Sequence, residues 1–439
     1  MIDRFTHAPF RLASLDELRS AIEQLGLDVA VSEDASCLAK AVEVKGHTIP
    51  NSMATHPMES CDCAPDGSPG ELTFRRYRRF GAGGAGLIWF EACAVVPDGR
   101  AHPTQLWIHE GNWGDLARLT DECRRSAADS MGAEHRPFTV LQITHSGRYS
   151  HVPRIVYHDP ILDPARGISP DQPVISDDEL RSLEDAFVEA ARLAFKAGFD
   201  AVDVKACHRY LINDLLAAHT RAGEYGGSYE NRTRFLKNVI SRVRGEGVVA
   251  CRLNLFDAHP YPYGWGMDAE SPDAPCLDEP RRLLGELRDM GVRLINVTMG
   301  NPYRTPHINR PYDKGAYYPQ EHPLVGVERL LSLTRQARAG LSELVVIGTG
   351  YSWLRHLWPH VAAAEIGRGS AQIVGLGRQA YTFPGFAKEI IETGRLDKRH
   401  TCVTCSSCAQ LVRAGKPTGC VRFDPETYRP IYGHVMRDA

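Results

Sequence analysis

The sequence predicts an α/β protein built as a (β/α)8 TIM barrel with short additions at both ends. Short apolar runs alternate with longer segments of helical period, and eight such runs can be counted over the chain. The 439 residues exceed the usual length of one domain, but α/β barrels reach this size as a single domain. An open doubly wound sheet is the alternative, because strand number alone does not prove closure. We expect an N-terminal extension over 1–47, the barrel itself over 48–395 and a four-cysteine segment over 396–439.

The predicted strands are apolar runs rich in β-branched and aromatic residues. Their order along the chain is 48–58, 86–96, 138–146, 200–206, 247–255, 292–299, 343–350 and 371–378. The first of them, TIPNSMATHPM, is the least regular. Alternation with helices favours parallel pairing of all eight strands.

The segments between these runs predict helices and loops. Residues 176–197 begin with a serine that is followed three residues later by a glutamate, which is close to a capping box. The amphipathic stretch 14–27 predicts a helix lying against the barrel bottom. Segments 256–280 and 300–323 are dense in proline, glycine and aromatic residues, so we expect long active-site loops at the C-terminal face.

Composition excludes several classes of partner. The 51 basic and 54 acidic residues give a net charge of −3, which offers no basic surplus for nucleic acid or an anionic membrane. The N-terminus lacks the apolar core of a signal peptide, and the sequence has no long apolar run. We therefore expect a cytoplasmic protein that acts on a small molecule.

Two glycine turns follow the last two predicted strands. Residues 348–350 read GTG, and residues 375–378 read GLGR. Both turns can direct backbone N–H groups at an anion, and loops after strands 7 and 8 of such barrels often bind phosphate. Gly350, Gly377 and Arg378 are therefore candidate phosphate ligands, although each turn alone is also typical of a simple tight turn.

Five polar side chains occur in strands that should be buried: Glu91, Gln142, His145, Lys205 and Arg252. An unpaired charge in a protein core destabilises it by several kcal/mol, so these groups need partners. Something anionic or rich in hydrogen-bond acceptors should therefore lie inside the barrel mouth. A flavin fits, because its pyrimidine edge offers acceptors and its phosphate would reach the glycine turns.

Four of the twelve cysteines form a pattern near the C-terminus, C-x2-C-x2-C-x11-C at Cys402, Cys405, Cys408 and Cys420. The other eight are scattered, and we interpret them as buried or inert thiols. Three cysteines at this close spacing with a distant fourth favour a 4Fe–4S cluster. Structural zinc is the alternative, since it also takes four thiolates. A site that holds neither remains a third possibility.

Six motifs in order resemble those of the old yellow enzyme family of FMN-dependent oxidoreductases. They are HPMESCDCAPDG, GGAGLIWFEACAVVPDGR, LQITHSGR, GFDAVDVKACHRYLINDLLAAHTRAGEYGGSYENRTRF, CRLN and IVGLGRQAYTFP. The stretch EYGGSYENRTRF is the most specific, and the resemblance covers roughly residues 45 to 390. The terminal cysteines resemble the iron–sulfur members, such as 2,4-dienoyl-CoA reductase, 2-enoate reductase and trimethylamine dehydrogenase.

The resemblance implies a set of FMN-binding residues. Those around the flavin would be Pro57, Met58, Glu59, Ala92, Gln142 and Arg252, with the phosphate at Gly350, Gly377 and Arg378. It also implies reduction by NADH or NADPH, or by another electron carrier in the iron–sulfur members. No G-x-G-x-x-G motif follows the cysteines, so we expect such a carrier to be a separate protein or another subunit. We further expect a homo-oligomer.

The motif KACHRYL places three candidate catalytic residues, Lys205, His208 and Tyr210. In the family, the first two positions bind the carbonyl or another anionic group of the substrate, and the tyrosine supplies a proton. This arrangement suits reduction of an activated C=C bond, because donors would stabilise enolate charge while the phenol protonates the carbon opposite the hydride. Core packing is the alternative explanation for His208 and Tyr210.

Three residues depart from the family pattern. Lys205 replaces the usual histidine, so it could bind a negatively charged substrate or pair with Glu59. Glu59 stands where relatives often have a small residue, and Arg209, where relatives usually have glycine, could add a second cation at the mouth. An amine dehydrogenase, with Tyr261, Tyr263 and Trp265 around a cationic substrate, and an electron-transfer subunit remain alternatives.

Overall fold

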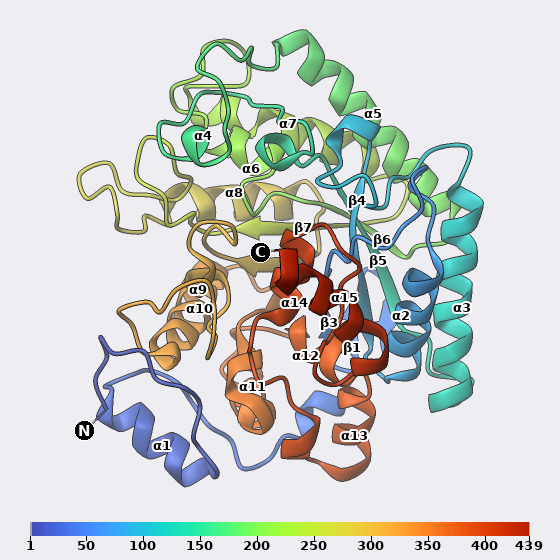
Figure 1. Ribbon diagram of the computed structural model, residues 1–439, viewed down its shortest axis with the longest axis vertical. Helices are drawn as coiled ribbons and strands as arrows, with labels where there is room; N and C mark the ends of the chain where they lie inside the picture. The colour runs from blue at the N-terminus through green and yellow to red at the C-terminus, as the bar shows by residue number, and fades with distance from the viewer. Residues whose placement is uncertain (1, 439) are drawn as a thin grey trace.

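Eight parallel strands close into a barrel in the computed structural model, which describes residues 2–438 (Figure 1). The strands are β3 (Met53–Thr55), β4 (Leu87–Ala94), β5 (Phe138–Thr144), β6 (Ala201–Val204), β7 (Val248–Asn254), β8 (Leu294–Thr298), β9 (Val345–Gly348) and β10 (Ile373–Leu376). Each strand pairs with its neighbour in sequence, and β10 closes the barrel against β3. Each of the eight predicted runs contains one of these strands, so the barrel is confirmed and the open sheet is excluded.

Helices follow most of the strands and cover the outside of the barrel (Figure 1). The helices are α1 (Leu15–Gln24), α2 (Glu71–Ala82), α3 (Trp113–Met131), α4 (Leu162–Ala165), α5 (Asp177–Lys196), α6 (Leu211–Leu216), α7 (Tyr229–Val243), α8 (Asp278–Asp289), α9 (Pro306–Asn309), α10 (Pro323–Arg338), α11 (Trp358–Gly367), α12 (Arg378–Thr382), α13 (Phe386–Thr393), α14 (Ser407–Arg413) and α15 (Pro425–Asp438). Short 3-10 turns are η1 (Ser36–Ala39), η2 (Pro97–Gly99), η3 (Gly147–Tyr149), η4 (Tyr351–Leu357) and η5 (Lys398–His400). Helix α5 starts with the predicted capping box of Ser176 and Glu179. No helix within residues 2–438 is both long and apolar enough to cross a membrane.

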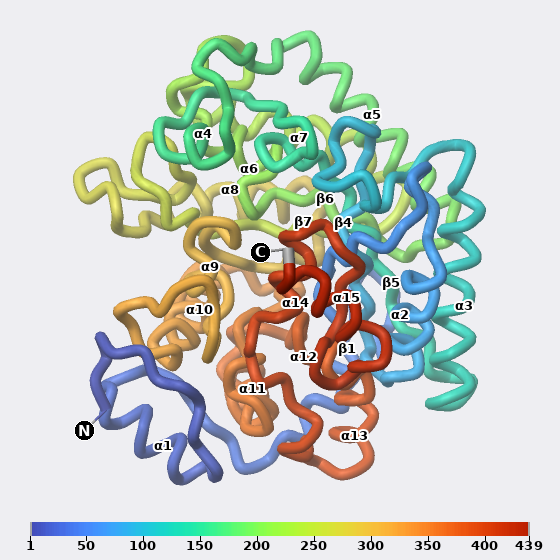
Figure 2. Tube along the Cα trace, viewed as in Figure 1, coloured from blue at the N-terminus to red at the C-terminus, as the bar shows by residue number. Residues whose placement is uncertain are grey.

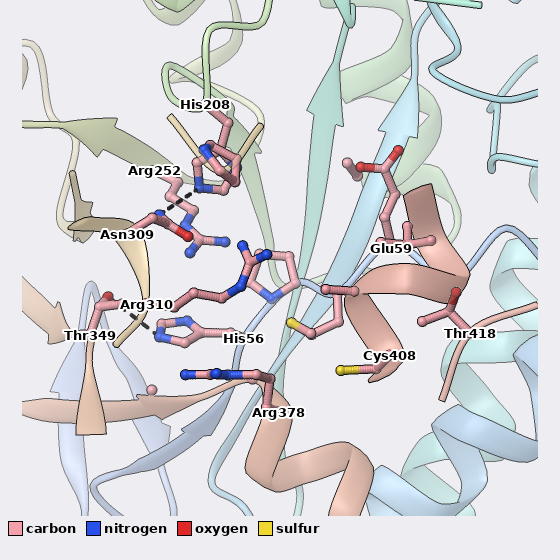
Figure 3. A pocket seen from close by; sticks show the side chains of 18 of the residues that line it. His56, Glu59, His208, Arg252, Asn309, Arg310, Thr349, Arg378, Cys408 and Thr418 are labelled. Atoms are coloured by element: carbon pink, nitrogen blue, oxygen red, sulfur yellow. Dashed lines mark hydrogen bonds between the residues drawn. The ribbon is translucent and has the colours of Figure 1, made fainter. Parts of the chain in front are cut away.

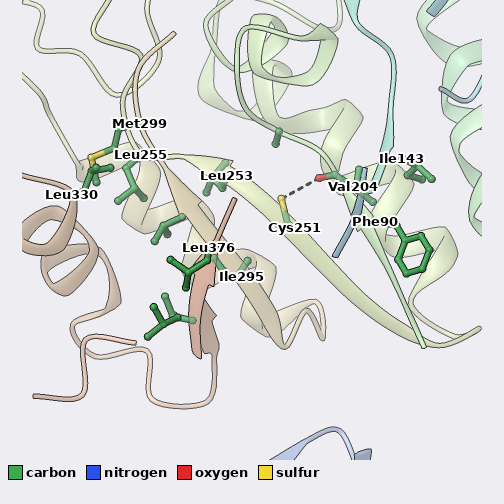
Figure 4. Packing of buried hydrophobic residues seen from close by; sticks show 14 of the residues in the cluster. Phe90, Ile143, Val204, Cys251, Leu253, Leu255, Ile295, Met299, Leu330 and Leu376 are labelled. Atoms are coloured by element: carbon green, nitrogen blue, oxygen red, sulfur yellow. Dashed lines mark hydrogen bonds between the residues drawn. The ribbon is translucent and has the colours of Figure 1, made fainter. Parts of the chain in front are cut away.

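The strands separate two apolar cores. Outward-facing side chains such as Phe90, Ile143 and Cys251 pack under the helices, as Figure 4 shows. Inward-facing side chains near the start of each strand, such as Trp89 and Leu294, fill the lower barrel. Further along the strands, toward their C-terminal ends, the inward-facing side chains are polar. These side chains line a cavity above the inner apolar core.

A β-bulge in β4 decides which way two neighbouring residues point. The pairing of β4 with β5 shifts register between Phe90 and Cys93, so the chain gains one residue there. As a result Ala92 lines the barrel mouth, while Glu91 pairs with Arg76 of α2. The expectation that Glu91 faces the mouth is therefore wrong, since strict alternation does not survive the bulge.

The N-terminal extension lies along the side of the barrel. Its predicted helix is confirmed as α1, but the extension packs near η4 and α11, with Ser32 N–H donating to the carbonyl of His360 at 3.0 Å. Figure 2 shows this segment beside α10 and α11. The barrel bottom is instead covered by a hairpin of β1 (Val42–Val44) and β2 (His47–Ile49), whose Val44 and Ile49 join the inner core.

The C-terminal segment folds back over the barrel mouth (Figure 1). Asp424 forms ion pairs with Arg75 and Arg79 of α2, with Oδ2 of Asp424 at 2.7 Å and 2.5 Å from their Nη1 atoms. The N–H of Thr418 donates to the carbonyl of Ser60 at 2.8 Å. These contacts hold the cysteine-rich residues against the loops where catalysis in this fold takes place. The division into segments 1–47, 48–395 and 396–439 stays a prediction.

Candidate active site

A deep cavity, here the main cavity, opens at the C-terminal ends of the strands (Figure 3). With its open mouth it holds about 1200 Å³ of space not filled by protein atoms. All twelve predicted flavin-binding and catalytic residues line it: Pro57, Met58, Glu59, Ala92, Gln142, Lys205, His208, Tyr210, Arg252, Gly350, Gly377 and Arg378. They come from seven of the eight strand ends, so only the closed barrel brings them together.

Asp203 organises the floor beneath this cavity. Its carboxylate accepts hydrogen bonds from the Gln142 side chain at 2.6 Å, from the Trp89 indole at 3.0 Å and from the backbone N–H of Arg252 at 2.7 Å. Burial raises the pKa of Asp203 above its usual value. These hydrogen bonds fix the orientation of the Gln142 amide and the backbone position of Arg252 before any ligand binds.

Arg252 has no protein partner for its charge. It is 6% exposed, none of the ion pairs within residues 2–438 includes it, and its buried Nε has no hydrogen-bond acceptor. Burial lowers its pKa. A buried guanidinium of this kind needs a ligand with acceptors. A flavin pyrimidine edge offers such acceptors, so the free donor fits FMN, and the assignment of Arg252 as a flavin ligand stays a prediction.

The phosphate end of the predicted site lies at the two glycine turns. Gly350 has a φ of 107°, a conformation that favours glycine, and it lines the main cavity. Arg378 donates from Nη2 to the carbonyl of Pro311 at 2.8 Å, while its buried Nη1 has no acceptor. A Cβ on Gly377 would come within 2.7 Å of Met58 Sδ, so the absence of a side chain lets these segments approach. Arg378 therefore keeps a free donor for an anion.

The turn that carries the candidate catalytic residues is held in an uncommon conformation. His208 and Arg209 have φ angles of 66° and 61°, in the left-handed region that strains residues other than glycine. The turn points His208 and Tyr210 into the main cavity. Contacts with the surrounding structure must therefore stabilise this strained backbone conformation.

Arg209 provides that stabilisation, and the expectation that it adds a cation at the mouth is wrong. Its side chain is fully buried and points away from the cavity, with ion pairs to Asp257 at 2.9 Å, Asp214 at 2.9 Å and Asp159 at 3.4 Å. Burial opposes ionisation of Asp159, but the hydrogen bond from His259 and the charge of Arg209 hold its pKa below the usual range. We name Arg209, Asp159, Asp214, Asp257 and His259 the carboxylate network.

Tyr210 lies in a hydrogen-bonded chain. Its hydroxyl donates to Glu59 Oε2 at 3.0 Å and is 2.8 Å from the hydroxyl of Tyr303. Because the Tyr210 proton is directed at Glu59, Tyr303 is the donor in the second bond. Burial, followed by the Glu59 charge, raises the pKa of Tyr210. Tyr303 is 42% exposed, so the chain runs from solvent to a buried phenol.

Lys205 packs against Tyr210 rather than pairing with Glu59. Its ammonium lies 3.6 Å from the centre of the Tyr210 ring, a cation–π contact. No ion pair of the described residues includes Lys205, and burial lowers its pKa, which the charge of Glu59 opposes. Its three donors are therefore free for a ligand in the main cavity.

His208 is a neutral imidazole in this setting. Burial lowers its pKa well below the usual value, and the nearby charges of Arg252 and Lys205 add to the shift. The side-chain amide of Asn309 lies 3.4 Å from His208 Nε2, but its two N–H groups donate to Thr298 Oγ1 at 2.9 Å and to the carbonyl of Met299 at 3.1 Å. The neutral imidazole of His208 therefore keeps its one N–H donor for a ligand in the main cavity.

Several cavity residues escaped the sequence analysis, among them His56, Tyr303, Asn309, Arg310, Tyr381 and Arg413. Tyr303, Asn309 and Arg310 lie within 300–323, which was expected to be an active-site loop, but no spacing rule selects individual side chains there. Arg413 comes from α14, whose position over the barrel depends on long-range contacts. His56 directly precedes Pro57, and the only signal for it was this adjacency.

Other expectations are corrected. His145 is buried outside the cavity, where its Nδ1 accepts from the N–H of Gly147 at 3.0 Å. Segment 256–280 does not line the main cavity. Trp265 is buried and donates to the carbonyl of Asn254 at 3.0 Å, and Tyr261 and Tyr263 also lie outside the cavity. The aromatic surround suggested for a cationic substrate is therefore absent from the described lining.

The four C-terminal cysteines line one small pocket beside the main cavity. Arg378, Tyr381 and Cys408 border both spaces. Thr404 and Ser406, between the first three cysteines, have φ angles of 48° and 60°, so the loop is tightly curved. Burial and then the neighbouring Cys402 raise the pKa of the Cys408 thiol to about 12. Within residues 2–438, no three or more His, Cys, Asp or Glu side chains are close enough to hold a metal ion.

Comparison with known proteins decides the family. Residues 38–262 match the model of the NADH:flavin oxidoreductase / NADH oxidase family. An NADPH dehydrogenase of Geobacillus thermodenitrificans is 30% identical over 341 residues, which cover 74% of this chain and 92% of the relative. The chain belongs to this family. It is therefore an FMN-dependent oxidoreductase, and the predicted resemblance to the old yellow enzymes is confirmed.

Solved structures show the same fold for this family member. The 2-naphthoyl-CoA reductase complex superposes with a TM-score of 0.71 at 21% identity, over 88% of this chain. The old yellow enzyme homologue of Zymomonas mobilis gives a TM-score of 0.60 at 19% identity, over 88% of this chain and 98% of that one. The matched region is 57% of the 2-naphthoyl-CoA reductase chain, so it corresponds to only part of that protein.

Proposed function

We propose that this FMN oxidoreductase reduces an activated C=C bond of a small unsaturated substrate, with Tyr210 as the proton donor. One observation carries the proposal: Lys205, His208 and the Tyr210 hydroxyl converge on the cavity wall beside the unpaired Arg252. Bound FMN would supply the hydride, with NADH or NADPH as its source. Arg252 and Gln142 would hold the flavin ring, and Gly350, Gly377 and Arg378 its phosphate.

The residues of the chain divide the remaining work. Lys205 Nζ and the N–H of the neutral His208 imidazole are free donors, so they would bind the carbonyl oxygen of the substrate and stabilise negative charge that develops there. Tyr210 stays protonated at neutral pH because burial and Glu59 raise its pKa, and it would give this proton to the substrate carbon. Tyr303 would restore the proton, since it contacts both Tyr210 and solvent.

The test separates the two half-reactions of the FMN-loaded enzyme. In Tyr210→Phe, flavin reduction by NADPH should change less than about twofold, while reduction of 2-cyclohexen-1-one should slow by about 100-fold or more, which is typical for loss of a positioned acid. Tyr303→Phe is the matched control, because it keeps Tyr210 and should slow the second step by less than about tenfold. Equal effects of Tyr210→Phe on both steps would remove Tyr210 as the proton donor.

We propose further that Cys402, Cys405, Cys408 and Cys420 hold a 4Fe–4S cluster. Their common pocket and their C-x2-C-x2-C spacing support this choice. Three cysteines at two-residue spacing with a distant fourth suit a 4Fe–4S cluster better than the paired C-x2-C knuckles of structural zinc. A cluster would supply one-electron transfer next to the main cavity, to which Cys408 and Arg378 connect the pocket.

Anaerobic iron, sulfide and zinc analysis tests the cluster. About four irons and four sulfides per chain are expected, and Cys420→Ser should lose most of them. Cys276→Ser is the control, because Cys276 is a partly buried thiol outside this pocket. One zinc ion per chain without sulfide would contradict the proposal of a 4Fe–4S cluster. This measurement does not test three other predictions, which stay predictions: a cytoplasmic location, a homo-oligomer and a separate electron-transfer protein.

A further inference from the structure

A second cavity, here the outer chamber, lies between the 300–323 loop and the C-terminal segment. It holds about 990 Å³ of space with its opening included. Of its fourteen lining residues three are cationic, Arg310, Lys314 and Arg413, and none is acidic. Hydroxyl groups of Tyr312, Ser406 and other residues complete its wall. Such a lining is suited to an anion.

The outer chamber adjoins the main cavity. Arg310, Ala409 and Arg413 line both spaces, so their side chains lie at the boundary between the two. Figure 3 shows the Arg310 side chain inside the main cavity, between Arg378 on one side and His208 with Arg252 on the other. A ligand whose reacting end lies near His208 would pass Arg310 before it enters the chamber.

The three cations have no carboxylate partners. None of the ion pairs found within residues 2–438 includes Arg310, Lys314 or Arg413. The one side-chain bond found for Arg413 goes to the carbonyl of Pro302 at 3.2 Å. Burial lowers the pKa of Arg310 to about 10, and the charges of Arg378 and Arg413 add to that effect. Like charges gathered without acids repel one another until an anion joins them.

We propose that the outer chamber binds the phosphate groups of a small molecule whose reacting end lies in the main cavity. The proposal rests on the proposed function, because it assigns the tail of a substrate or electron donor used at that same site. Three cations with many N–H donors match a phosphate dianion or pyrophosphate better than a single carboxylate. Two molecules could carry such groups: a phosphorylated unsaturated substrate, or the nicotinamide dinucleotide that reduces the flavin.

Binding is tested first without turnover. The FMN-loaded protein is titrated with inorganic pyrophosphate by calorimetry, in parallel with Lys314→Gln and Lys416→Gln. Lys314, in the 300–323 loop, lines only the chamber, while Lys416, in the C-terminal segment, lines neither space. Lys314→Gln should weaken binding about tenfold, as expected for loss of a charge-assisted contact, and Lys416→Gln less than about twofold.

Three results would overturn the proposal. The wild-type protein could fail to bind pyrophosphate, or both variants could weaken binding equally, which would indicate general surface charge. The third is loss of flavin from Lys314→Gln, which would assign the chamber to the phosphate of FMN. Flavin absorbance per chain, measured in the same samples, detects this last case.

Half-reaction kinetics then identify the source of the phosphates. Crotonyl-pantetheine and crotonyl-4′-phosphopantetheine carry the same double bond and differ by one phosphate. If Lys314→Gln slows only the phosphorylated substrate, the tail belongs to the substrate; if it slows only flavin reduction by NADPH, the tail belongs to the nucleotide. No effect on either would overturn the proposal. Wild-type failure to reduce 2-cyclohexen-1-one, with pyrophosphate binding intact, would instead reject the proposed function alone.

Discussion

Two neighbouring regions of this protein bury charge in opposite ways. Behind the catalytic turn, the carboxylate network surrounds Arg209 with three carboxylates within 3.4 Å. On the cavity side of the barrel, Arg252 is almost as deeply buried but has no ion pair within the described residues. The first region is complete without a ligand, whereas the second is complete only when something binds.

The difference teaches how to separate structural from functional charge. Arg252 lies in strand β7 and Arg209 in the turn after β6, and both are charged groups that a core would normally reject. Partners from elements far apart in the chain neutralise Arg209, so its role is to hold the left-handed turn. The Nε of Arg252 has no acceptor among the described residues and its side chain lines the main cavity, which is the arrangement expected of a ligand-binding charge. The three predictions below test this contrast.

The largest effect is expected from Arg209→Met. This change leaves Asp159, Asp214 and Asp257 buried without their shared cation, which should destabilise the protein by about 3–5 kcal/mol. Urea unfolding of the FMN-loaded protein, followed by circular dichroism, measures it. The variant should also slow reduction of 2-cyclohexen-1-one, because the turn that carries His208 loses its support.

Arg181→Met is the matched control. Arg181 is an exposed arginine with ion pairs to Asp178 and Glu224, so its loss should change the unfolding free energy by less than about 1 kcal/mol. Equal stability of the two variants would show that the carboxylate network does not support the turn.

The second effect concerns pH and the buried His145, which directly follows β5 and whose carbonyl accepts from the N–H of Leu211, next to the turn, at 3.0 Å. Burial lowers its pKa to about 4, while the charge of Asp98 opposes this shift and that of Arg154 adds to it. An unfolded histidine titrates near pH 6.5, so the folded state gains stability above that pH and loses it as pH falls toward 4. The loss attributable to this residue should reach about 3 kcal/mol.

Unfolding free energies at pH 7.5, 5.5 and 4.5 test this expectation. The His145→Asn variant, which cannot titrate there, should lose less stability than wild type over the same range. An identical pH dependence in both proteins would mean that His145 is not held neutral in the folded state.

The smallest effect on folding, but a specific effect on binding, is expected from Arg252→Met. Arg252 has no protein partner, so the unfolding free energy of the flavin-free protein should change by less than about 1 kcal/mol. FMN affinity should fall by about 30-fold or more, which corresponds to loss of a charged hydrogen-bond donor worth about 2 kcal/mol. Fluorescence titration with FMN gives the dissociation constants.

A loss of apo-protein stability as large as that of Arg209→Met would contradict the comparison. So would unchanged FMN affinity, because it would place the pyrimidine edge of the flavin elsewhere. The two arginine variants together thus distinguish a charge that the fold needs from a charge that the ligand needs.

Barrel topology made much of the lining of the main cavity predictable from sequence. Parallel strands end at one face, and inward positions alternate along each strand, so Gln142, Lys205 and Arg252 could be assigned to the mouth from sequence alone. The same rule failed for Glu91, where a bulge in β4 reverses the alternation. It also failed for His145, which lies at the end of its strand and turns away from the cavity.

The sequence by itself determined the eight strands, the glycine turns, the cysteine pattern and the family. These depend on local periodicity, on backbone conformations that particular residues favour, and on motifs that are contiguous in the chain. The tertiary structure decided which charges are paired, because pairing is a relation between elements far apart in sequence. Only the closed barrel and the returning C-terminal segment could place Arg209 among carboxylates and leave Arg252, Arg310 and Arg413 without them.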